Sequence, residues 1–196
     1  PAFGEKFGRH WLDLVRYGRS MRLTNGNALV ARLARSVFDL GIPLWTSAPV
    51  TQLLIDDGQV TGAVVTRDGS AVRVQARSGV VLATGGFPQN RALRARLFPH
   101  APDGQAHWSP APPGNTGDGL ALGQSAGGHL MTDLPHAAAW VPVSLVPQPD
   151  GSGNPFPHFV DRGKPGMIAV AGRGKRFVNE GRSYHDFCQA MVSACA

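Results

Sequence analysis

The chain has few cysteines and no long apolar segment. No run of apolar residues approaches the roughly 20 that a helix needs to cross a bilayer, and the first residues lack the charged-then-apolar order of a secretory leader. We therefore expect neither a membrane span nor a leader in this stretch. The two cysteines, Cys188 and Cys195, fall on one expected helix, where seven residues of rise separate them by about 10 Å, too far for a disulfide. Free thiols are typical of a reducing compartment, so we expect a cytoplasmic protein.

Several short catalytic and metal-binding motifs are also missing. The seven histidines are scattered, and neither CxxC nor HExxH spacing occurs, so the sequence predicts no metal site. The absence of GxSxG argues against a serine hydrolase built on a nucleophile elbow. No GxGxxG dinucleotide fingerprint follows a strand in this stretch.

Charged residues make up only 16% of the chain, yet the net charge is +6. A net positive charge is typical of proteins that bind nucleic acid, so this class of partner has to be considered. No aromatic stacking motif is interleaved with the basic residues. We therefore expect a solvated basic face and no nucleic-acid partner, while a basic binding module stays an alternative. The arginines of the first 35 residues are Arg9, Arg16, Arg19, Arg22, Arg32 and Arg35.

The first part of the chain predicts helices followed by a β-meander. A short helix is expected around Trp11 to Val15, and a wide apolar face predicts a second from about Asn27 to Leu40, ended by Gly41. A short strand is expected over Ile42 to Trp45. Apolar runs separated by Asp-Gly turns then predict a three-stranded meander. Its strands are expected over 50–55, 60–66 and 71–76.

The rest of the chain alternates short elements with loops rich in proline and glycine, which number 16 and 25 and exclude an all-helical bundle. The apolar run Gly79 to Ala83 is typical of a strand buried on both faces. We expect helices over 91–98, 119–126 and 184–194, a strand over 140–146, and a hairpin joining 167–171 to 175–178. The fold class is therefore mixed, α/β or α+β, with a soft domain boundary near residue 131.

Three segments carry backbone or side-chain groups that suit ligand binding or catalysis. Thr84-Gly85-Gly86 follows the apolar run, where glycines let a backbone approach a flat or phosphorylated ligand or merely relieve strain in a turn. Asp118 either caps the helix after it or accepts from a ligand hydroxyl. Residues 172–186 read as a charged hairpin tip before a helix, in which Ser183 is the N-cap and Arg176 and Glu180 form an exposed ion pair worth under about 1 kcal/mol.

These segments, in this order, resemble the flavoprotein family of succinate dehydrogenases, fumarate reductases and 3-ketosteroid dehydrogenases. The matching pieces are the helix, strand and meander over 27–76, the segments 79–87 and 115–119, Gly127-Gly128, and Lys175-Arg176-Phe177-Val178-Asn179-Glu180. The resemblance implies FAD as cofactor and a Rossmann-like FAD-binding domain, partly covered by residues 1–130. It implies that residues 131–196 belong to a capping, substrate-binding domain and its return to the FAD domain.

The resemblance also assigns residues to the cofactor. Val50 would contact the adenine through its backbone, and Asp118 would bind FAD in addition to capping its helix. The cofactor's pyrophosphate or ribose would lie close to Ala83, Thr84, Gly85 and Gly86.

Two departures from the fumarate reductase pattern point to the substrate. Trp140-Val141-Pro142 stands near a His-Pro-Thr that holds a carboxylate, and Tyr184 stands in place of an active-site arginine. Desolvated carboxylates need cationic partners, so these aromatic residues suit an apolar small-molecule substrate with a carbonyl, for which a 3-ketosteroid is one candidate. In the ketosteroid dehydrogenase branch the tyrosine that matches Tyr184 is the catalytic base.

A phenol needs nearby donors or a positive charge to act as a base at neutral pH. Arg182 or His185 would supply it, and Arg182 and Trp140 are the candidate substrate contacts. The alternative within the family is a dicarboxylate or tricarboxylate oxidoreductase, with Arg162, Arg176 or Arg182 binding carboxylates.

Members of this family open with GxGxxG and end with a segment that closes around the flavin, and neither pattern occurs here. We therefore expect an internal piece of a longer oxidoreductase, whose partners include the N- and C-terminal portions of the same polypeptide. Alone, the piece is expected to bind FAD weakly or not at all.

Overall fold

The computed structural model describes residues 2–134 and 136–195, and the chain divides into two compact units, Pro1–Pro49 and Val50–Ala196. The first unit holds two helices, α1 (Ala2–Tyr17) and α2 (Asn25–Asp39). Helix α1 is longer than expected because Phe3, Phe7 and Trp11 recur at four-residue spacing, with ring centroids 6.1 and 6.3 Å apart along one face. Asp13 on α1 accepts a hydrogen bond at 2.9 Å from the backbone N–H of Met21, which lies after the helix.

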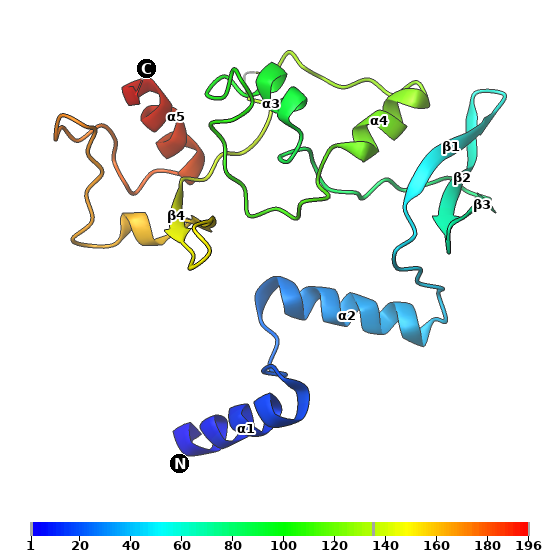
Figure 1. Ribbon diagram of the computed structural model, residues 1–196, viewed down its shortest axis with the longest axis horizontal. Coiled ribbons are helices and arrows are strands. Elements are labelled where there is room, and N and C mark those ends of the chain that lie inside the picture. The colour runs from blue at the N-terminus through cyan, green and yellow to red at the C-terminus, as the bar shows by residue number, and fades with distance from the viewer. Residues whose placement is uncertain (1, 135, 196) are drawn as a thin grey trace. The chain divides into compact units, whose positions relative to one another are not determined.

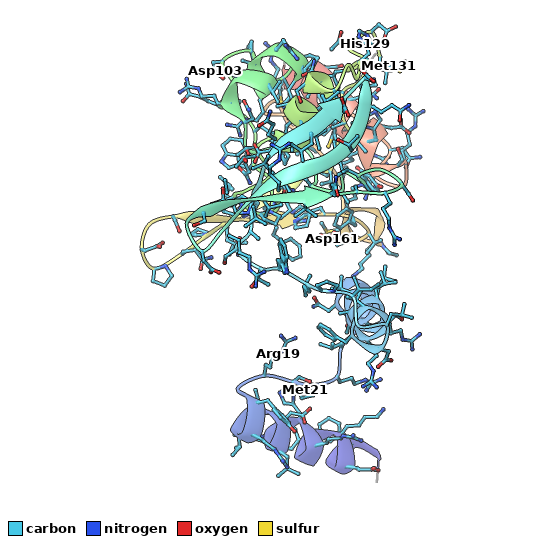
Figure 2. All side chains as sticks on the ribbon, turned by 90° about the vertical axis from the view of Figure 1, so that its right-hand side faces the viewer. Arg19, Met21, Asp103, His129, Met131 and Asp161 are labelled. Carbon is cyan, nitrogen blue, oxygen red and sulfur yellow. The ribbon has the colours of Figure 1, made fainter. Side chains whose placement is uncertain are left out.

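Helix α2 is confirmed and ends as expected before Gly41, whose φ of +64° favours glycine. None of its residues is buried, and side chains project outward around it (Figure 2). The strand expected over Ile42 to Trp45 is wrong. That stretch is irregular, because no described strand pairs with it and a strand needs a ladder partner.

The second unit begins with the expected meander. Strands β1 (Val50–Asp56), β2 (Gln59–Arg67) and β3 (Ser70–Gln75) form an antiparallel sheet in the order β1-β2-β3 (Figure 1). Asp57 and Gly58, and likewise Asp68 and Gly69, have positive φ, as two-residue hairpin turns require. Each strand lies within one residue of its expected limits.

A small apolar core joins this sheet to the next helices. Leu53 on β1 and Ala63 on β2 are buried with Leu122 on α4 (Asp118–Ser125), and Val80 and Ala126 pack against them. Figure 1 shows α4 beside β1, in agreement with the contacts between these elements. Val80 therefore ties the segment after the meander to this core.

The buried strand expected over Gly79 to Ala83 is wrong. The segment is irregular, and Val81 is 90% exposed. No strand among the described residues lies alongside it, so its N–H and C=O groups have no ladder to join. An unbroken apolar run favours a doubly covered strand only where neighbouring strands are present.

Three helices of the second unit confirm the sequence pattern: α3 (Arg91–Leu97), α4, and α5 (Tyr184–Cys195). Asn90 caps α3 by accepting from the backbone N–H of Leu93 at 3.0 Å. The expected cap of α4 is corrected. Gly117, at φ +90°, is the N-cap, and Asp118 lies in the first turn, where its carboxylate accepts from Thr116 Oγ1 at 2.8 Å.

The remaining strands differ in part from expectation. Strand β4 (Val143–Pro147) begins later than expected and pairs antiparallel with β5 (Gly153–Pro157); a 3₁₀ turn, η1 (Asp161–Gly163), follows. The hairpin expected over 167–178 reduces to one bridge, between Val170 and Arg176. Its ladder is interrupted because the carboxylate of Glu180 takes the N–H of Ala169, at 2.7 Å. Among the described helices none is long and apolar enough to span a membrane.

Candidate functional site

The glycine-containing strip after the apolar run is exposed and open. Thr84, Gly85 and Gly86 are exposed, and within the described part of the chain none of their backbone groups has a hydrogen-bond partner. Gly85 has a φ of +78°, and a Cβ added to it would lie 2.9 Å from Asn115 Nδ2. Only glycine fits this position, and its neighbours leave their N–H groups available to a ligand.

The strip lies against the start of α4. A Cβ added to Gly119 would lie 2.1 Å from Thr84 Oγ1, so helix and strip are already in contact. Asp118, in the first turn of α4, is exposed and keeps acceptor capacity beyond its bond from Thr116. Free N–H groups, missing Cβ atoms and a carboxylate beside them fit the phosphate and ribose groups of FAD.

The other residues assigned to the cofactor lie at the edges of this region. Ala83 precedes the strip and is exposed. Val50 is the first residue of β1 and pairs with Val65 on β2. Their roles toward FAD stay predictions.

A cavity of about 460 Å³ connects the strip to Trp140. Gly86 and Trp140 both line it, so the structure brings one predicted cofactor residue and one predicted substrate residue to the same space. Part of its wall is aromatic: Trp140 meets Phe98 edge-on with ring centroids 4.6 Å apart, and His100 at 4.8 Å. Phe98 is 3% exposed and forms the centre of this aromatic cluster.

Sequence reasoning missed the two histidines in the cavity wall. His100 Nε2 and His107 Nδ1 are hydrogen-bonded at 3.2 Å, and both residues line the cavity. Burial lowers the pKa of His100. The pKa of His107 is lowered to about 4, chiefly by burial and in smaller part by His100 and Arg94. The available signal was their close spacing in the sequence, which by itself did not indicate a shared cavity.

Trp140 is joined to the start of α5. Its backbone N–H donates to His185 Nδ1 at 3.1 Å, so His185 is engaged with Trp140. Tyr184, one residue earlier, is 39% exposed and packs edge-on against Phe159, with ring centroids 5.6 Å apart. Tyr184 therefore lies next to His185, whose hydrogen bond with Trp140 links the start of α5 to the cavity.

Arg162 places a positive charge near the ring of Tyr184. Its guanidinium lies 5.9 Å from the ring centroid of Tyr184. It is held there by donating to the carbonyl of His158 at 3.2 Å, to that of Phe159, and to that of Arg182 at 2.5 Å. Arg182 contributes a backbone carbonyl to this arrangement, and its contact with substrate stays a prediction.

The ion pair between Arg176 and Glu180 is more buried than expected. Glu180 is 6% exposed and accepts from Arg176 Nε at 3.1 Å, from Arg176 Nη2, and from the N–H of Ala169. The hydrogen bonds from Arg176, with the one from Ala169, lower the pKa of Glu180 to about 2. This carboxylate fastens the loop that precedes α5. The described residues contain no group of His, Cys, Asp and Glu that could hold a metal ion.

Comparison with known proteins gives the same family as the sequence motifs. Residues 2–196 match a family model described as FAD binding domain. The chain is 42% identical over 190 residues to 4-oxocyclohex-2-ene-1-carboxylate 5-dehydrogenase of Sinomonas cyclohexanicum, covering 96% of this chain and 32% of that protein. It is 35% identical over 173 residues to 3-oxosteroid 1-dehydrogenase of Mycolicibacterium smegmatis, covering 85% of this chain and 28% of that protein.

The fold is also shared with a solved structure. The crystal structure of 3-ketosteroid delta1-dehydrogenase from Sterolibacterium denitrificans, in complex with 1,4-androstadiene-3,17-dione, superposes with a TM-score of 0.79 at 32% identity. The match covers 95% of this chain and 33% of that chain. The chain thus spans about a third of the length of the relatives that it matches. On the family match over residues 2–196, with the exposed strip and the shared fold, the chain belongs to the FAD binding domain family of flavoproteins, whose cofactor is FAD.

Proposed function

We propose that this chain belongs to an FAD-dependent oxidoreductase that acts on the CH–CH bond beside a ring carbonyl. In this proposal the chain contributes the strip of residues 84–86 (the cofactor strip) and part of the substrate site. The observation that carries the proposal is the cavity shared by Gly86 and Trp140, with Trp140 tied by a hydrogen bond to the helix that begins at Tyr184. The named activities of the relatives, dehydrogenation of a 3-oxosteroid and of a 4-oxocyclohexene carboxylate, support the same reaction class.

Each group in this region has a role in the proposal. The backbone of the strip and the carboxylate of Asp118 hold the phosphate and ribose end of FAD, while Val50 meets the adenine through its backbone. When bound, FAD supplies the hydride acceptor. The residues of the strip and its approach are Ala83, Thr84, Gly85 and Gly86.

The substrate side is built from aromatic residues. Trp140 and its neighbours keep water away from an apolar ring. Arg182, in the loop before α5, is assigned as a second substrate contact in this proposal. The phenol oxygen of Tyr184 takes the proton from the carbon beside the carbonyl. Arg162, whose guanidinium lies 5.9 Å from the ring centroid, is the positive charge that assists this proton transfer in the proposal.

The relatives are about three times as long as the matched region, so further portions of the same polypeptide complete both sites in this proposal. Residues 1–130 then form part of the FAD-binding domain, and residues 131–196 part of the capping domain. The chain alone would bind FAD weakly or not at all. The two free cysteines, Cys188 and Cys195, support a reducing, cytoplasmic location.

The test is anaerobic reduction of FAD in the complete protein. A 3-ketosteroid or a cyclohexanone derivative is expected to bleach the flavin absorbance, and succinate is not. Reduced enzyme that is reoxidised by fumarate, with no reaction toward ring ketones, would overturn the substrate class and favour the dicarboxylate branch of the family. Flavin that co-purifies with the isolated chain at near one equivalent would contradict the expected weak binding.

A further inference from the structure

The wall of the cavity offers almost no charge. Among the described residues that line it there is no lysine, arginine, aspartate or glutamate. Its polar side chains include His100, His107 and Cys188, and burial raises the pKa of the Cys188 thiol to about 11, so this thiol is uncharged at neutral pH. A ligand in the cavity therefore meets aromatic and aliphatic carbon and a few neutral polar atoms.

The two histidines together present one donor and one acceptor. A neutral imidazole has one N–H and one bare nitrogen. In the bond between His100 Nε2 and His107 Nδ1, one ring donates and the other accepts. The ring that accepts keeps its N–H on the other nitrogen, and the ring that donates keeps a bare nitrogen. In the described part of the chain neither outer nitrogen has a partner, and neither is fully buried.

The pair stays neutral at physiological pH. The pKa of His107 is lowered to about 4, first by burial and then by the nearby His100 and Arg94, and burial also lowers the pKa of His100. Arg94 on α3 is a cation beside this pair; its Nη1 donates to the backbone carbonyl of His107 at 3.2 Å, and Arg94 is not among the residues that line the cavity. The pair can thus supply one N–H donor to the cavity, and the described residues that line the cavity supply no cation to offset the desolvation of a carboxylate.

The geometry points to the pair of His100 and His107 as the polar anchor of this cavity and to a neutral cyclic ketone as its ligand, in preference to a ring that carries a carboxylate. The ring lies against Trp140 and Phe98, and its carbonyl oxygen accepts from the outer N–H of the pair. This inference rests on the proposed function and adds to it a substrate class and an anchoring pair.

The test compares two ligands that differ only at the ring substituent. 4-Methylcyclohexanone and 4-oxocyclohexanecarboxylate have the same ring and carbonyl, and the dithionite-reduced holoenzyme cannot dehydrogenate either. Binding is measured at pH 7 by equilibrium dialysis. The neutral ketone is expected to bind at least about tenfold more tightly than the carboxylate, because the anion loses hydration without gaining a cationic partner.

Variants then test the anchor. His107→Phe keeps an aromatic ring beside Phe98 and removes both ring nitrogens, so ketone binding is expected to weaken about fivefold to tenfold, the loss of one hydrogen bond. His129→Phe makes the same change at an exposed histidine that does not line the cavity, and should leave binding unchanged. In the unmodified protein, the imidazole ¹⁵N resonances of the pair are expected to move when the ketone binds, which does not depend on any variant folding.

Equal or tighter binding of the carboxylate, unchanged ketone binding in His107→Phe, or unmoved imidazole resonances would each overturn the inference. Failure of the proposed function looks different. In that case the ketone binds in a His107-dependent manner but never reduces the flavin in the oxidised holoenzyme. If ring ketones reduce the flavin equally well in His107→Phe, the proposed function stands and the anchoring role is wrong.

Discussion

The backbone N–H of Trp140 donates to Nδ1 of His185 at 3.1 Å, across 45 residues of sequence. His185 follows Tyr184 directly in α5, so this bond sets the start of the helix against the aromatic wall of the cavity. The ring of His185 also meets His136 edge-on, with centroids 4.8 Å apart. One side chain therefore links the candidate base to the candidate substrate site.

Replacing His185 by phenylalanine is expected to lower the free energy of unfolding by about 1–3 kcal/mol, because the N–H of Trp140 loses its acceptor in a half-buried place. Urea denaturation followed by tryptophan fluorescence measures the change. His185→Asn is the matched control, since an amide oxygen can take the place of Nδ1. An equal loss in both variants would show that the hydrogen bond is not responsible.

Tyr184→Phe removes only a hydroxyl, which has no hydrogen-bond partner in the described part of the chain, and keeps the ring contact with Phe159. We expect nearly unchanged stability and a fall of at least about 100-fold in the anaerobic rate of flavin reduction in the complete protein, the usual contribution of a general base. The chain has two tyrosines, and Tyr17→Phe on α1 is the control. A rate within a few-fold of wild type for Tyr184→Phe would remove this residue from the chemistry.

The ion pair of Glu180 makes stability depend on acid pH. The pKa of Glu180 is about 2 in the folded chain, against an ordinary value of 4.5. Its contribution is therefore fully present above about pH 4.5 and is lost as the pH falls through about 2. Thermal melting at a series of pH values is expected to show this loss.

Two variants check the source of that acid dependence. Glu180→Gln should be less stable at neutral pH and lack this acid-dependent loss. Arg176→Gln removes the largest cause of the lowered pKa, so it should narrow the pH window over which stability is lost. An acid profile that is the same in all three proteins would contradict the assignment.

Substitutions at two glycines of α4 separate the contact between this helix and the strip of residues 84–86 from the stability of the helix itself. A Cβ at Gly119 would lie 2.1 Å from Thr84 Oγ1, whereas one at Gly123 would make an ordinary contact of 3.7 Å with Leu82. Alanine stabilises a helix interior by roughly 0.5–1 kcal/mol relative to glycine, so Gly123→Ala should be neutral or stabilising. Gly119→Ala forces Thr84 to move, and FAD affinity in the complete protein should fall.

Fluorescence titration of the apoprotein with FAD measures this difference. Both variants carry the same substitution on the same short helix, so a helix effect would appear in both. Equal FAD affinity in the two variants would show that the contact between α4 and the strip does not matter for the cofactor.

The elements whose geometry is set by residues close together in the sequence were predicted well. The turns at Asp57-Gly58 and Asp68-Gly69 fix their own geometry through positive φ, and the meander follows from them. Helices α3 and α5 follow from apolar spacing and from local caps, such as Ser183, whose hydroxyl accepts from the N–H of Asp186 at 3.1 Å. The FAD binding domain family was likewise predicted from motifs that are each contiguous in the chain.

The wrong expectations share a physical cause. The apolar run that includes Val81 has the composition of a buried strand, but a ladder needs a second strand beside it, and composition cannot supply one. The hairpin around Gly174 failed because a side chain, Glu180, occupies the N–H of Ala169 that a longer ladder would have used.

By itself the sequence determined the local elements, the order of the flavoprotein motifs and the aromatic character of the positions at Trp140 and Tyr184. Only the tertiary structure decided that His100 and His107 share a hydrogen bond inside one cavity and that Arg162 supplies the charge beside Tyr184. Caps, turns and periodicity act over a few residues, so a linear sequence carries them. Cavities and charge contacts depend on residues far apart along the chain, whose distances are set only when the chain has folded.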